Sequence, residues 1–346
     1  MLLGGGAETV IVILANELIE CGFEVKILLA GQKNVSSALD PRVVIICDDY
    51  IPTGRGSRLV HRFIFLVKQI KSIHTDVFVS FCANINVFVL MANLFSQKRV
   101  VVSERADPNA HSFLLQKLIR FLYRFSNAVV TQVPDVSAWF PHSVSEKCIM
   151  IPNPIRKDLP EVYQGVRRKK IATSGRMIPE KNLLMLLKAF EILHKDYPDY
   201  TLEFFGDGSE RQTLQEYVLI NNLIDSVIFH DFTENLIKEI SDASVFAFSS
   251  NSEGMPNSVL EALAMGIPTV STDCPIGGPR MMITDHENGL LVPVGDVNAL
   301  YRAMEELLQD TVLAKKLSSR GVLLRDTFSV KKITNQWIEL LEKVCS

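Results

Sequence analysis

Short apolar runs of strand length alternate along the chain with longer stretches in which apolar residues recur at helical spacing. In the first half, the apolar runs predict strands at residues 24–29, 43–47, 76–81, 98–103, 128–132 and 148–151. The helical spacing predicts a helix that begins near Thr9 and ends near Gly22, followed by helices at 59–73, 85–95, 110–125 and 134–139. Strands that alternate with helices are typical of parallel βα units, so we expect a Rossmann-like first domain over residues 1–154.

The second half of the chain repeats this pattern. Its apolar runs predict strands at 170–175, 201–205, 227–229 and 245–248. The helical spacing predicts helices at 183–195 and 209–220, and a further helix whose first turn contains Pro256, Asn257 and Ser258. Between the halves, the proline-containing segment 151–155 leads into the charged stretch 156–170, which we interpret as an interdomain linker. We therefore expect a second doubly wound α/β domain over residues 155–326, and an amphipathic helix at 330–344 within the terminal segment 327–346.

The composition is that of a globular protein with two domains of ordinary size. The chain has 346 residues, of which 47% are hydrophobic and 22% charged, and it contains no run of 18 apolar residues. Its six cysteines are scattered without metal-site spacing, which indicates reduced thiols in the cytosol. Residues 1–154 hold 15 Lys and Arg against 12 Asp and Glu, whereas the remainder holds 21 against 27. This small basic excess favours an anionic acceptor or a membrane surface, or it has no functional meaning. We expect no nucleic-acid partner.

Three glycines at positions 4 to 6 precede the first predicted helix. Glycines before a helix form a loop that lets the backbone approach a ligand, but Thr9 stands where a dinucleotide fingerprint requires a third glycine. Almost no strand precedes this loop. Because the first strand of a doubly wound sheet is central, we expect a truncated first strand, with the sequence beginning downstream of the true start.

The most informative stretch for function is 249–271, where a predicted strand leads through a polar glycine turn into a helix. A helix that starts after a strand presents unpaired backbone N–H groups and the positive end of its dipole, which suits a phosphate. Glu253 lies before this helix, and Glu261 lies eight residues later within it. Such a pair can hold two ends of an extended ligand. Alternatively, Glu261 is a solvated helix carboxylate and Glu253 a turn residue near the helix dipole.

Residues 253–270, with the sequence Glu-Gly-Met-Pro-Asn-Ser-Val-Leu-Glu-Ala-Leu-Ala-Met-Gly-Ile-Pro-Thr-Val, resemble the donor-binding signature of retaining glycosyltransferases of the GT4 type. The string Ser-Gly-Arg-x-x-Pro-Glu-Lys-Asn at 174–182 resembles the segment of that family in which arginine and lysine grip the donor diphosphate. The resemblance is strong over residues 145–310 and looser before them. It implies the GT-B fold, in which two Rossmann-like domains face each other across a cleft and the terminal helix crosses back onto the N-terminal domain.

The resemblance also implies roles for individual residues. Arg176 and Lys181 would neutralise the leaving diphosphate and Glu253 would bind the sugar, which makes these three the candidate catalytic residues. Without the resemblance, Arg176 and Lys181 would be solvated loop cations. Glu261 would hold the ribose, and the Gly-Asp-Gly loop at 206–208 and the turn at 232–234 would surround the base and ribose. The donor site as a whole would comprise Gly175, Arg176, Lys181, Gly206, Gly208, Phe232, Thr233, Glu253, Gly254, Met255, Pro256, Asn257, Ser258, Val259 and Glu261.

Candidate acceptor contacts lie in the N-terminal domain. The resemblance places a loop with Gly5 and Gly6 near the acceptor and the donor phosphate, and Glu104 and Arg105 follow a predicted strand at its carboxyl end, where ligands bind in open α/β sheets. This Ser-Glu-Arg loop resembles bacterial enzymes that extend undecaprenyl-diphosphate-linked glycans of capsule or O-antigen. Residues 112–125 combine large apolar side chains with three cations, as either a helix on the inner-membrane interface or a core helix with a basic solvated edge.

The expected reaction moves a hexosyl or N-acetylhexosaminyl group from a nucleotide sugar, UDP-linked in our interpretation, to a lipid-linked glycan. The family resemblance implies retention of configuration by front-face displacement, without a protein nucleophile. The sequence contains no Asp-x-Asp pair, so we expect neither a metal nor a cofactor. Two alternatives stay open: a GT-B sugar-nucleotide epimerase, which needs no second substrate, and a non-catalytic subunit that has kept the nucleotide-sugar pocket.

Overall fold

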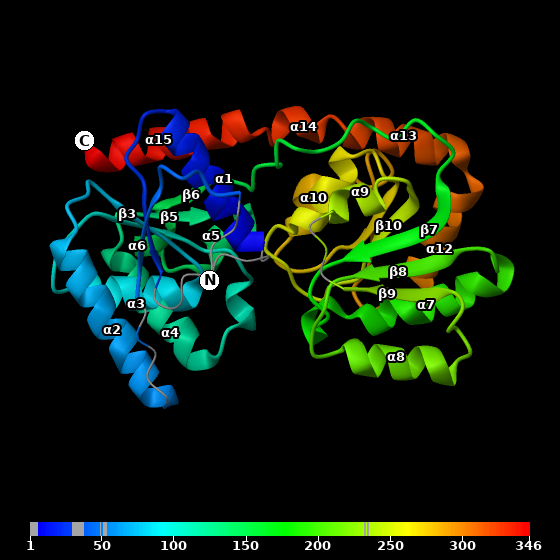
Figure 1. The fold of residues 1–346 in the computed structure, drawn as a ribbon, viewed down its shortest axis with the longest axis horizontal. Helices are drawn as coiled ribbons and strands as arrows, with labels where there is room; N and C mark the ends of the chain where they lie inside the picture. The colour runs from blue at the N-terminus through cyan, green and yellow to red at the C-terminus, as the bar shows by residue number, and fades with distance from the viewer. Residues whose placement is uncertain (1–5, 30–37, 49, 51–53, 232, 234) are drawn as a thin grey trace. The chain divides into compact units, whose positions relative to one another are not determined.

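The computed structural model describes residues 6–29, 38–48, 50, 54–231, 233 and 235–346, and it divides the chain into two compact units (Figure 1). Unit 1 comprises Met1–Pro154 together with Val330–Ser346, and unit 2 comprises Ile155–Ser329. The terminal helix thus belongs to unit 1, although the chain reaches it only after the whole of unit 2.

Unit 1 contains two separate parallel sheets among its described residues. One sheet pairs β1 (Lys26–Leu29) with β2 (Val44–Cys47). The other has the order β3-β4-β5-β6, with β3 at Phe78–Phe81, β4 at Val100–Ser103, β5 at Ala128–Thr131 and β6 at Cys148–Met150. All four residues of β4 and of β5 are buried, as expected for parallel strands covered on both faces.

Helices cover both faces of the four-stranded sheet in unit 1. On one face α3 (Ala83–Asn93) packs on β3 and β4, between α2 (Arg55–Ser72) and α4 (Phe113–Leu122). On the opposite face α1 (Gly6–Glu20) contacts α15 (Val330–Cys345), as Figure 1 shows. Trp337 of α15 is buried and packs 5.7 Å from the ring of Phe81 in β3. The remaining elements of unit 1 are short: η1 (Pro108–Ala110), η2 (Tyr123–Phe125), α5 (Pro134–Trp139) and α6 (His142–Ser145).

Unit 2 is built on a six-stranded parallel sheet with the order β12-β11-β10-β7-β8-β9. The strands are β7 (Arg168–Ser174), β8 (Thr201–Phe205), β9 (Val227–His230), β10 (Ala243–Phe248), β11 (Thr269–Thr272) and β12 (Leu290–Val292). The helical elements are η3 (Pro179–Lys181), α7 (Leu183–Asp196), α8 (Arg211–Ile220), α9 (Leu236–Ile240), α10 (Asn257–Ala264), α11 (Gly278–Met282), α12 (Val297–Gln309), α13 (Thr311–Gly321) and α14 (Leu324–Thr327). The chain winds outward from β7 to β9 on one side and from β10 to β12 on the other. The topological switch point therefore lies between β7 and β10.

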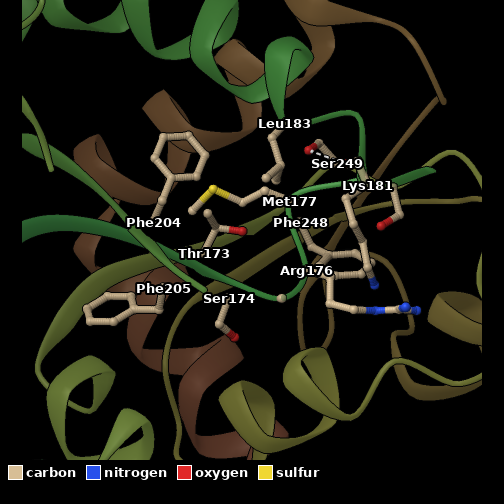
Figure 2. Close-up of a pocket in the computed structure, with 12 residues that line it drawn as sticks. Thr173, Ser174, Arg176, Met177, Lys181, Leu183, Phe204, Phe205, Phe248 and Ser249 are labelled. Atoms are coloured by element: carbon tan, nitrogen blue, oxygen red, sulfur yellow. Dashed lines mark hydrogen bonds between the residues drawn. The ribbon is translucent and has the colours of Figure 1, made fainter. Parts of the chain in front are cut away.

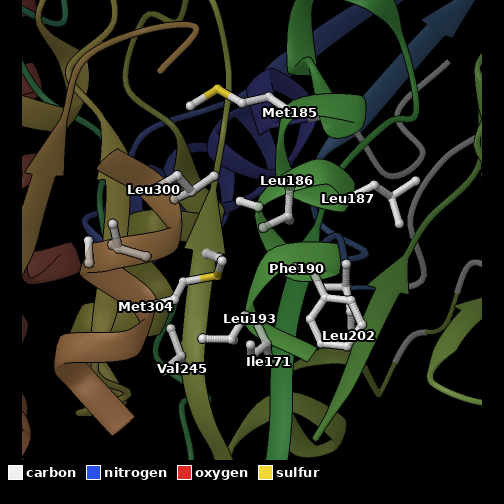
Figure 3. Close-up of a cluster of buried hydrophobic side chains, with 14 of the residues drawn as sticks. Ile171, Met185, Leu186, Leu187, Phe190, Leu193, Leu202, Val245, Leu300 and Met304 are labelled. Carbon is white, nitrogen blue, oxygen red and sulfur yellow. The ribbon is translucent and has the colours of Figure 1, made fainter. Parts of the chain in front are cut away.

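The core of unit 2 follows from the helical spacing of α7. Leu186, Phe190 and Leu193 recur on one face of this helix and are fully buried against the sheet, where Ile171, Leu202 and Val245 meet them (Figure 3). Leu300 and Met304 of α12 complete the same cluster. This packing holds β7, and hence the loop that follows it, in a fixed place.

Several boundaries differ from those predicted. The predicted linker at 156–170 ends early, because β7 already begins at Arg168, and α8 begins at Arg211, two residues after the predicted start. The predicted helix at 110–125 is divided into α4 and two short 3₁₀ turns. Residues 297–327, to which no elements were assigned, form α12, α13 and α14. Asp296 and Asp310 cap the first two of these helices by accepting backbone N–H groups, which is the sequence signal that was missed.

No helix in the described part of the chain is both long enough and apolar enough to cross a membrane.

Candidate functional site

The predicted donor residues gather at the carboxyl ends of the strands in unit 2, on both sides of the switch point. A pocket lies there (Figure 2), formed by the end of β7 and the following loop, by β8 and by the end of β10. Gly175, Arg176 and Lys181 line it directly, beside Phe205 and Phe248. Open α/β sheets bind ligands at this location because adjacent loops separate at the switch point and leave a crevice.

Hydrogen bonds join the β7 loop to the β10 loop. The Asn251 backbone N–H donates to the carbonyl of Glu180 at 2.8 Å, and the Ser249 hydroxyl donates to the carbonyl of Lys181 at 3.0 Å. Asn182, held at a positive φ of 45°, donates from its side-chain amide to Asn251 Oδ1 at 2.9 Å. The two loops consequently form one rigid platform, although 70 residues separate them in the sequence.

Lys181 and Glu253, from these two loops, form an ion pair. Lys181 Nζ donates to Glu253 Oε1, and the Ser250 hydroxyl donates to the same oxygen at 2.8 Å. Both side chains are mostly buried, with exposed fractions of 18% and 16%. The sequence did not single out Ser250, yet this hydroxyl orients the carboxylate. Its position three residues before Glu253, in the turn, was the available signal.

Arg176 lies at the mouth of the pocket and is exposed. Among the described residues its guanidinium has no hydrogen bond or ion pair, in contrast to Lys181, and Figure 2 shows it extending beside the Lys181 side chain. A free guanidinium next to a paired ammonium leaves net positive potential at this edge of the pocket. Such a site attracts an anion, and the planar fork of arginine suits phosphate oxygens.

The start of α10 adds backbone donors to this region. Pro256 occupies the N-cap position, and no side chain caps the helix, so the first N–H groups have no partner within the helix. Gly254, Met255 and Pro256 are buried, Asn257 and Ser258 are partly exposed, and Val259 is fully buried in the core. Val259 can therefore offer a ligand only its backbone.

Close backbone contacts explain three glycines near the site. A Cβ at Gly206, whose φ is +137°, would lie 2.2 Å from the carbonyl oxygen of Gly175, and one at Gly208 would lie 2.3 Å from that of Met177. At Gly278, a Cβ would lie 1.6 Å from the carbonyl oxygen of Gly254. Gly206 and Gly208 thus position the β7 loop, and Gly278, which was not among the predicted site residues, positions the turn after Glu253.

Glu261 lies within α10, near Arg156 and Asp158. Burial raises the pKa of its carboxyl to about 7; Arg156 opposes this shift and Asp158 adds to it. Arg156 binds Asp158 instead, through Nη2 at 2.6 Å from Oδ2. Glu261 is therefore not the solvated helix carboxylate of the alternative interpretation. It is a partly buried carboxyl group whose neighbouring cation, Arg156, is bonded to Asp158.

Of the two remaining predicted donor residues, Thr233 lies shortly before α9 and Phe232 lies outside the described residues. The Thr233 hydroxyl donates to Glu239 at 2.8 Å and accepts the Asn235 backbone N–H at 3.1 Å, so local contacts already use it. Shortly before Thr233 in the chain, the His230 ring stacks on Phe205, a residue that lines the pocket, with centroids 4.3 Å apart and an angle of 6° between the rings.

In unit 1, Glu104 and Arg105 follow β4 and take part in a polar network. Glu104 is buried and accepts the Tyr123 hydroxyl at 2.8 Å, while Asn86 donates to that same hydroxyl oxygen at 2.8 Å. The Arg105 backbone N–H donates to this carboxylate at 3.2 Å, and its guanidinium donates to Asn153 Oδ1 at 2.6 Å. Burial lowers the pKa of Arg105 to about 10, so it stays charged at neutral pH. Glu104 is engaged inside unit 1, which leaves Arg105 as the more accessible of the two.

Of the two residues of the predicted glycine loop, Gly5 lies outside the described residues, and Gly6 is the first residue of α1. The helix therefore begins three residues before the predicted start near Thr9, and Gly6 belongs to its first turn and not to a loop.

Among the residues that the structure describes, no group of three or more His, Cys, Asp and Glu side chains could hold a metal ion. The absence of a metal requirement stays a prediction.

The chain is similar to known proteins in its fold and in part of its sequence. The chain matches the crystal structure of Anabaena HepE in complex with UDP and glucose with a TM-score of 0.85, over 98% of this chain and 96% of that one, at 18% identity. The fold is accordingly that of the GT-B glycosyltransferases. Residues 154–322 match the family Glycosyl transferases group 1.

Two bacterial relatives match almost the whole chain. An uncharacterized glycosyltransferase of Haemophilus influenzae is 23% identical over 343 residues, which cover 97% of this chain and 96% of that protein. An alpha-1,4-N-acetyl-D-galactosaminyltransferase of Campylobacter jejuni, whose name specifies a PP-undecaprenol-linked glycan, is 26% identical over 353 residues, covering 98% and 96%.

Proposed function

We propose that this protein is a retaining, metal-independent glycosyltransferase that moves a hexosyl or N-acetylhexosaminyl group from a UDP-sugar to a lipid-linked glycan in surface polysaccharide assembly. The observation that carries the proposal is the Lys181–Glu253 pair beside the unpaired Arg176, at the switch point of unit 2. These cations and this carboxylate lie together at the carboxyl ends of the strands. They can bind a ligand that is anionic at one end and rich in hydroxyl groups at the other.

In the proposed reaction, the bond between the sugar C1 and the β-phosphate oxygen breaks while C1 bonds to the acceptor oxygen. Negative charge grows on the departing diphosphate, and Arg176, Lys181 and the backbone N–H groups at the start of α10 stabilise it. The acceptor proton passes to the departing phosphate, so no protein nucleophile is needed. Glu253 binds sugar hydroxyls, Glu261 binds the ribose, and the stacked rings of His230 and Phe205 lie close enough to the pocket to adjoin the base.

The acceptor part of the proposal rests on the relative from Campylobacter jejuni, whose name specifies a PP-undecaprenol-linked glycan, and on Arg105, a cation at the carboxyl end of β4. We propose that this acceptor is met at the cytoplasmic face of the inner membrane.

The test is incubation with individual UDP- and GDP-sugars, with and without an undecaprenyl-diphosphate-linked glycan, followed by measurement of free nucleotide and of the elongated lipid. Nucleotide release that depends on the acceptor supports a transferase. A changed sugar without acceptor, either released or still linked to the nucleotide, indicates the epimerase, and binding with neither release nor change of the sugar indicates a non-catalytic subunit. Addition of EDTA should leave the rate unchanged, and a loss of activity restored by Mn²⁺ would refute metal independence.

A further inference from the structure

The solvent-facing side of α4 and η2 has an unusual composition. The exposed residues from 113 to 125 are Phe113, Leu114, Lys117, Arg120, Phe121, Arg124 and Phe125. Phe113 and Leu114 expose 71% and 69% of their surface, and Phe121 exposes 51%. Isolated exposed apolar residues are common, but a helix face made only of large apolar and cationic side chains is typical of an interaction surface.

The cations of this face cover its aromatic rings. Lys117 Nζ lies 4.3 Å from the centroid of Phe113, and the Arg124 guanidinium lies 4.4 Å from that of Phe121. No carboxylate among the described residues pairs with Lys117 or Arg124. Their positive charge is therefore available to an external anion, and their aliphatic stems lie along the apolar surface.

Helix α2 extends this surface. It lies on the same side of the sheet as α4, with α3 packed between them (Figure 1). Its sequence contains no Asp or Glu, and it exposes Leu59, Val60 and Ile64 at 45%, 59% and 60%. We use the term basic apolar face for the exposed side chains of α2 and of residues 113–125.

The charge of unit 1 is concentrated on this face. Residues 56–72 and 112–125 together contain seven exposed Lys and Arg and no Asp or Glu, whereas the rest of residues 1–154 contains eight Lys and Arg and twelve Asp and Glu. The net charge of the N-terminal half is small because a strongly basic face is offset by the acidic remainder of residues 1–154. The alternative interpretation places the large apolar side chains of 112–125 in the core. Only Ile119 and Leu122 of α4 are buried, so this interpretation is wrong for the phenylalanines of α4.

We propose that the basic apolar face docks on a bilayer of anionic phospholipid, with the phenyl and leucyl side chains in the headgroup region and the lysines and arginines at the phosphates. Charge complementarity selects this occupant, because a protein partner would need an equally acidic and equally apolar surface. Amphipathic helices that carry Lys and Arg beside Phe and Leu bind membrane interfaces in this way. The proposed function bears on this inference in one respect: a lipid-linked acceptor would be met at the docked surface.

The test is co-sedimentation of the full chain with vesicles of phosphatidylcholine that contain either no phosphatidylglycerol or about 30 mol% of it. We expect binding to the anionic vesicles and little to the neutral ones. Each Lys or Arg near an anionic surface strengthens binding about fivefold, so Lys117→Gln/Arg124→Gln should weaken vesicle binding about 25-fold. Phe113→Ser/Phe121→Ser should weaken it by about tenfold or more, because two buried phenyl groups are lost.

Matched controls remove similar side chains elsewhere. Leu219→Ser/Ile220→Ser removes two exposed apolar residues of α8, and Lys188→Gln/Lys315→Gln removes two exposed cations of unit 2. These controls should bind vesicles like the unchanged protein. The proposal is overturned if the unchanged protein ignores anionic vesicles, or if the controls lose as much binding as the variants. It is also overturned if sedimentation velocity shows a dimer that Phe113→Ser/Phe121→Ser dissociates, because the face would then meet a second copy.

UDP binding by the same proteins separates this inference from the proposed function. Loss of vesicle binding with intact UDP binding assigns the effect to the face. Absence of UDP binding in the unchanged protein would count against the proposed function and leave the vesicle result standing.

Discussion

At the scale of single residues, the site is defined by which charges are paired and which are not. Lys181 and Glu253 neutralise each other, whereas Arg176 is exposed and free of ion pairs among the described residues. Under the proposed function, an arriving diphosphate is expected to meet Arg176 first and then to share Lys181 with Glu253. The pair keeps two mostly buried charges satisfied until the ligand arrives, because an isolated charge at such a site would be costly.

The first prediction concerns this pair. Lys181→Ala should lower the rate of sugar transfer about 100-fold or more, the usual effect of removing one group that stabilises developing negative charge. The measurement is kcat with a saturating donor. Lys188→Ala, which removes an exposed lysine of α7, is the control and should keep full activity. Near-full activity of Lys181→Ala would remove Lys181 from the site.

The second prediction concerns Glu261 and pH. Burial raises the pKa of its carboxyl from 4.5 to about 7, so between these values the folded state binds more protons than the unfolded chain. The free energy of unfolding should therefore fall as pH rises from 4.5 to 7, by about 1–3 kcal/mol. Glu261→Gln should abolish this contribution and be the more stable protein above pH 7. Urea unfolding at a series of pH values measures it.

Glu342→Gln, which changes an exposed glutamate of α15, serves as the control for that series. Equal pH dependence of Glu261→Gln and the unchanged protein would contradict the prediction.

At the scale of elements, the carboxyl edge of the sheet in unit 1 is fixed by a buried hydrogen-bond network. Tyr123 in η2 links Asn86 of α3 to Glu104 after β4. Burial and the nearby Glu104 raise the pKa of Tyr123, so its hydroxyl keeps its proton and donates it. The network thereby fixes the start of the loop that carries Arg105.

The third prediction tests this network. Tyr123→Phe removes the hydroxyl and leaves Asn86 and the buried Glu104 carboxylate each without one partner, which should lower the free energy of unfolding by about 1–3 kcal/mol. Tyr301→Phe removes the same kind of bond, to Glu305 on the partly exposed α12, and should cost less than about 1 kcal/mol. Urea unfolding of both variants measures the difference. Equal losses would show that burial of the network does not matter.

At the scale of the whole molecule, the chain forms two units with separate interiors. The predicted donor residues, from Gly175 to Glu261, all belong to unit 2, whereas the basic apolar face and Arg105 belong to unit 1. The two proposals therefore assign donor chemistry and surface recognition to different units. On this division we expect each unit to respond to its own ligand.

The fourth prediction follows from this division. Thermal unfolding should show two transitions, and UDP at about 100 times its Kd should stabilise unit 2 by about 2.7 kcal/mol while leaving the transition of unit 1 in place. Calorimetry combined with hydrogen exchange, which assigns each transition to residues, is the measurement. A shift confined to unit 1 would place the nucleotide outside the proposed site.

The sequence by itself determined the order of most helices and strands, the resemblance to glycosyltransferases and the positions of Arg176, Lys181 and Glu253, because hydrophobic period and loop strings are local properties. It missed α12 to α14, although Asp296 and Asp310 signalled the first two of these helices. Only the tertiary structure decided that Lys181 pairs with Glu253, that Gly278 must lack a side chain, and that Glu104 accepts a bond from Tyr123 while Arg105 donates to Asn153. It alone decided that the phenylalanines of α4 face solvent. These outcomes depend on which strands and helices pack together although they lie far apart in the sequence. Such contacts produce no periodic pattern of residues, so the sequence does not indicate them.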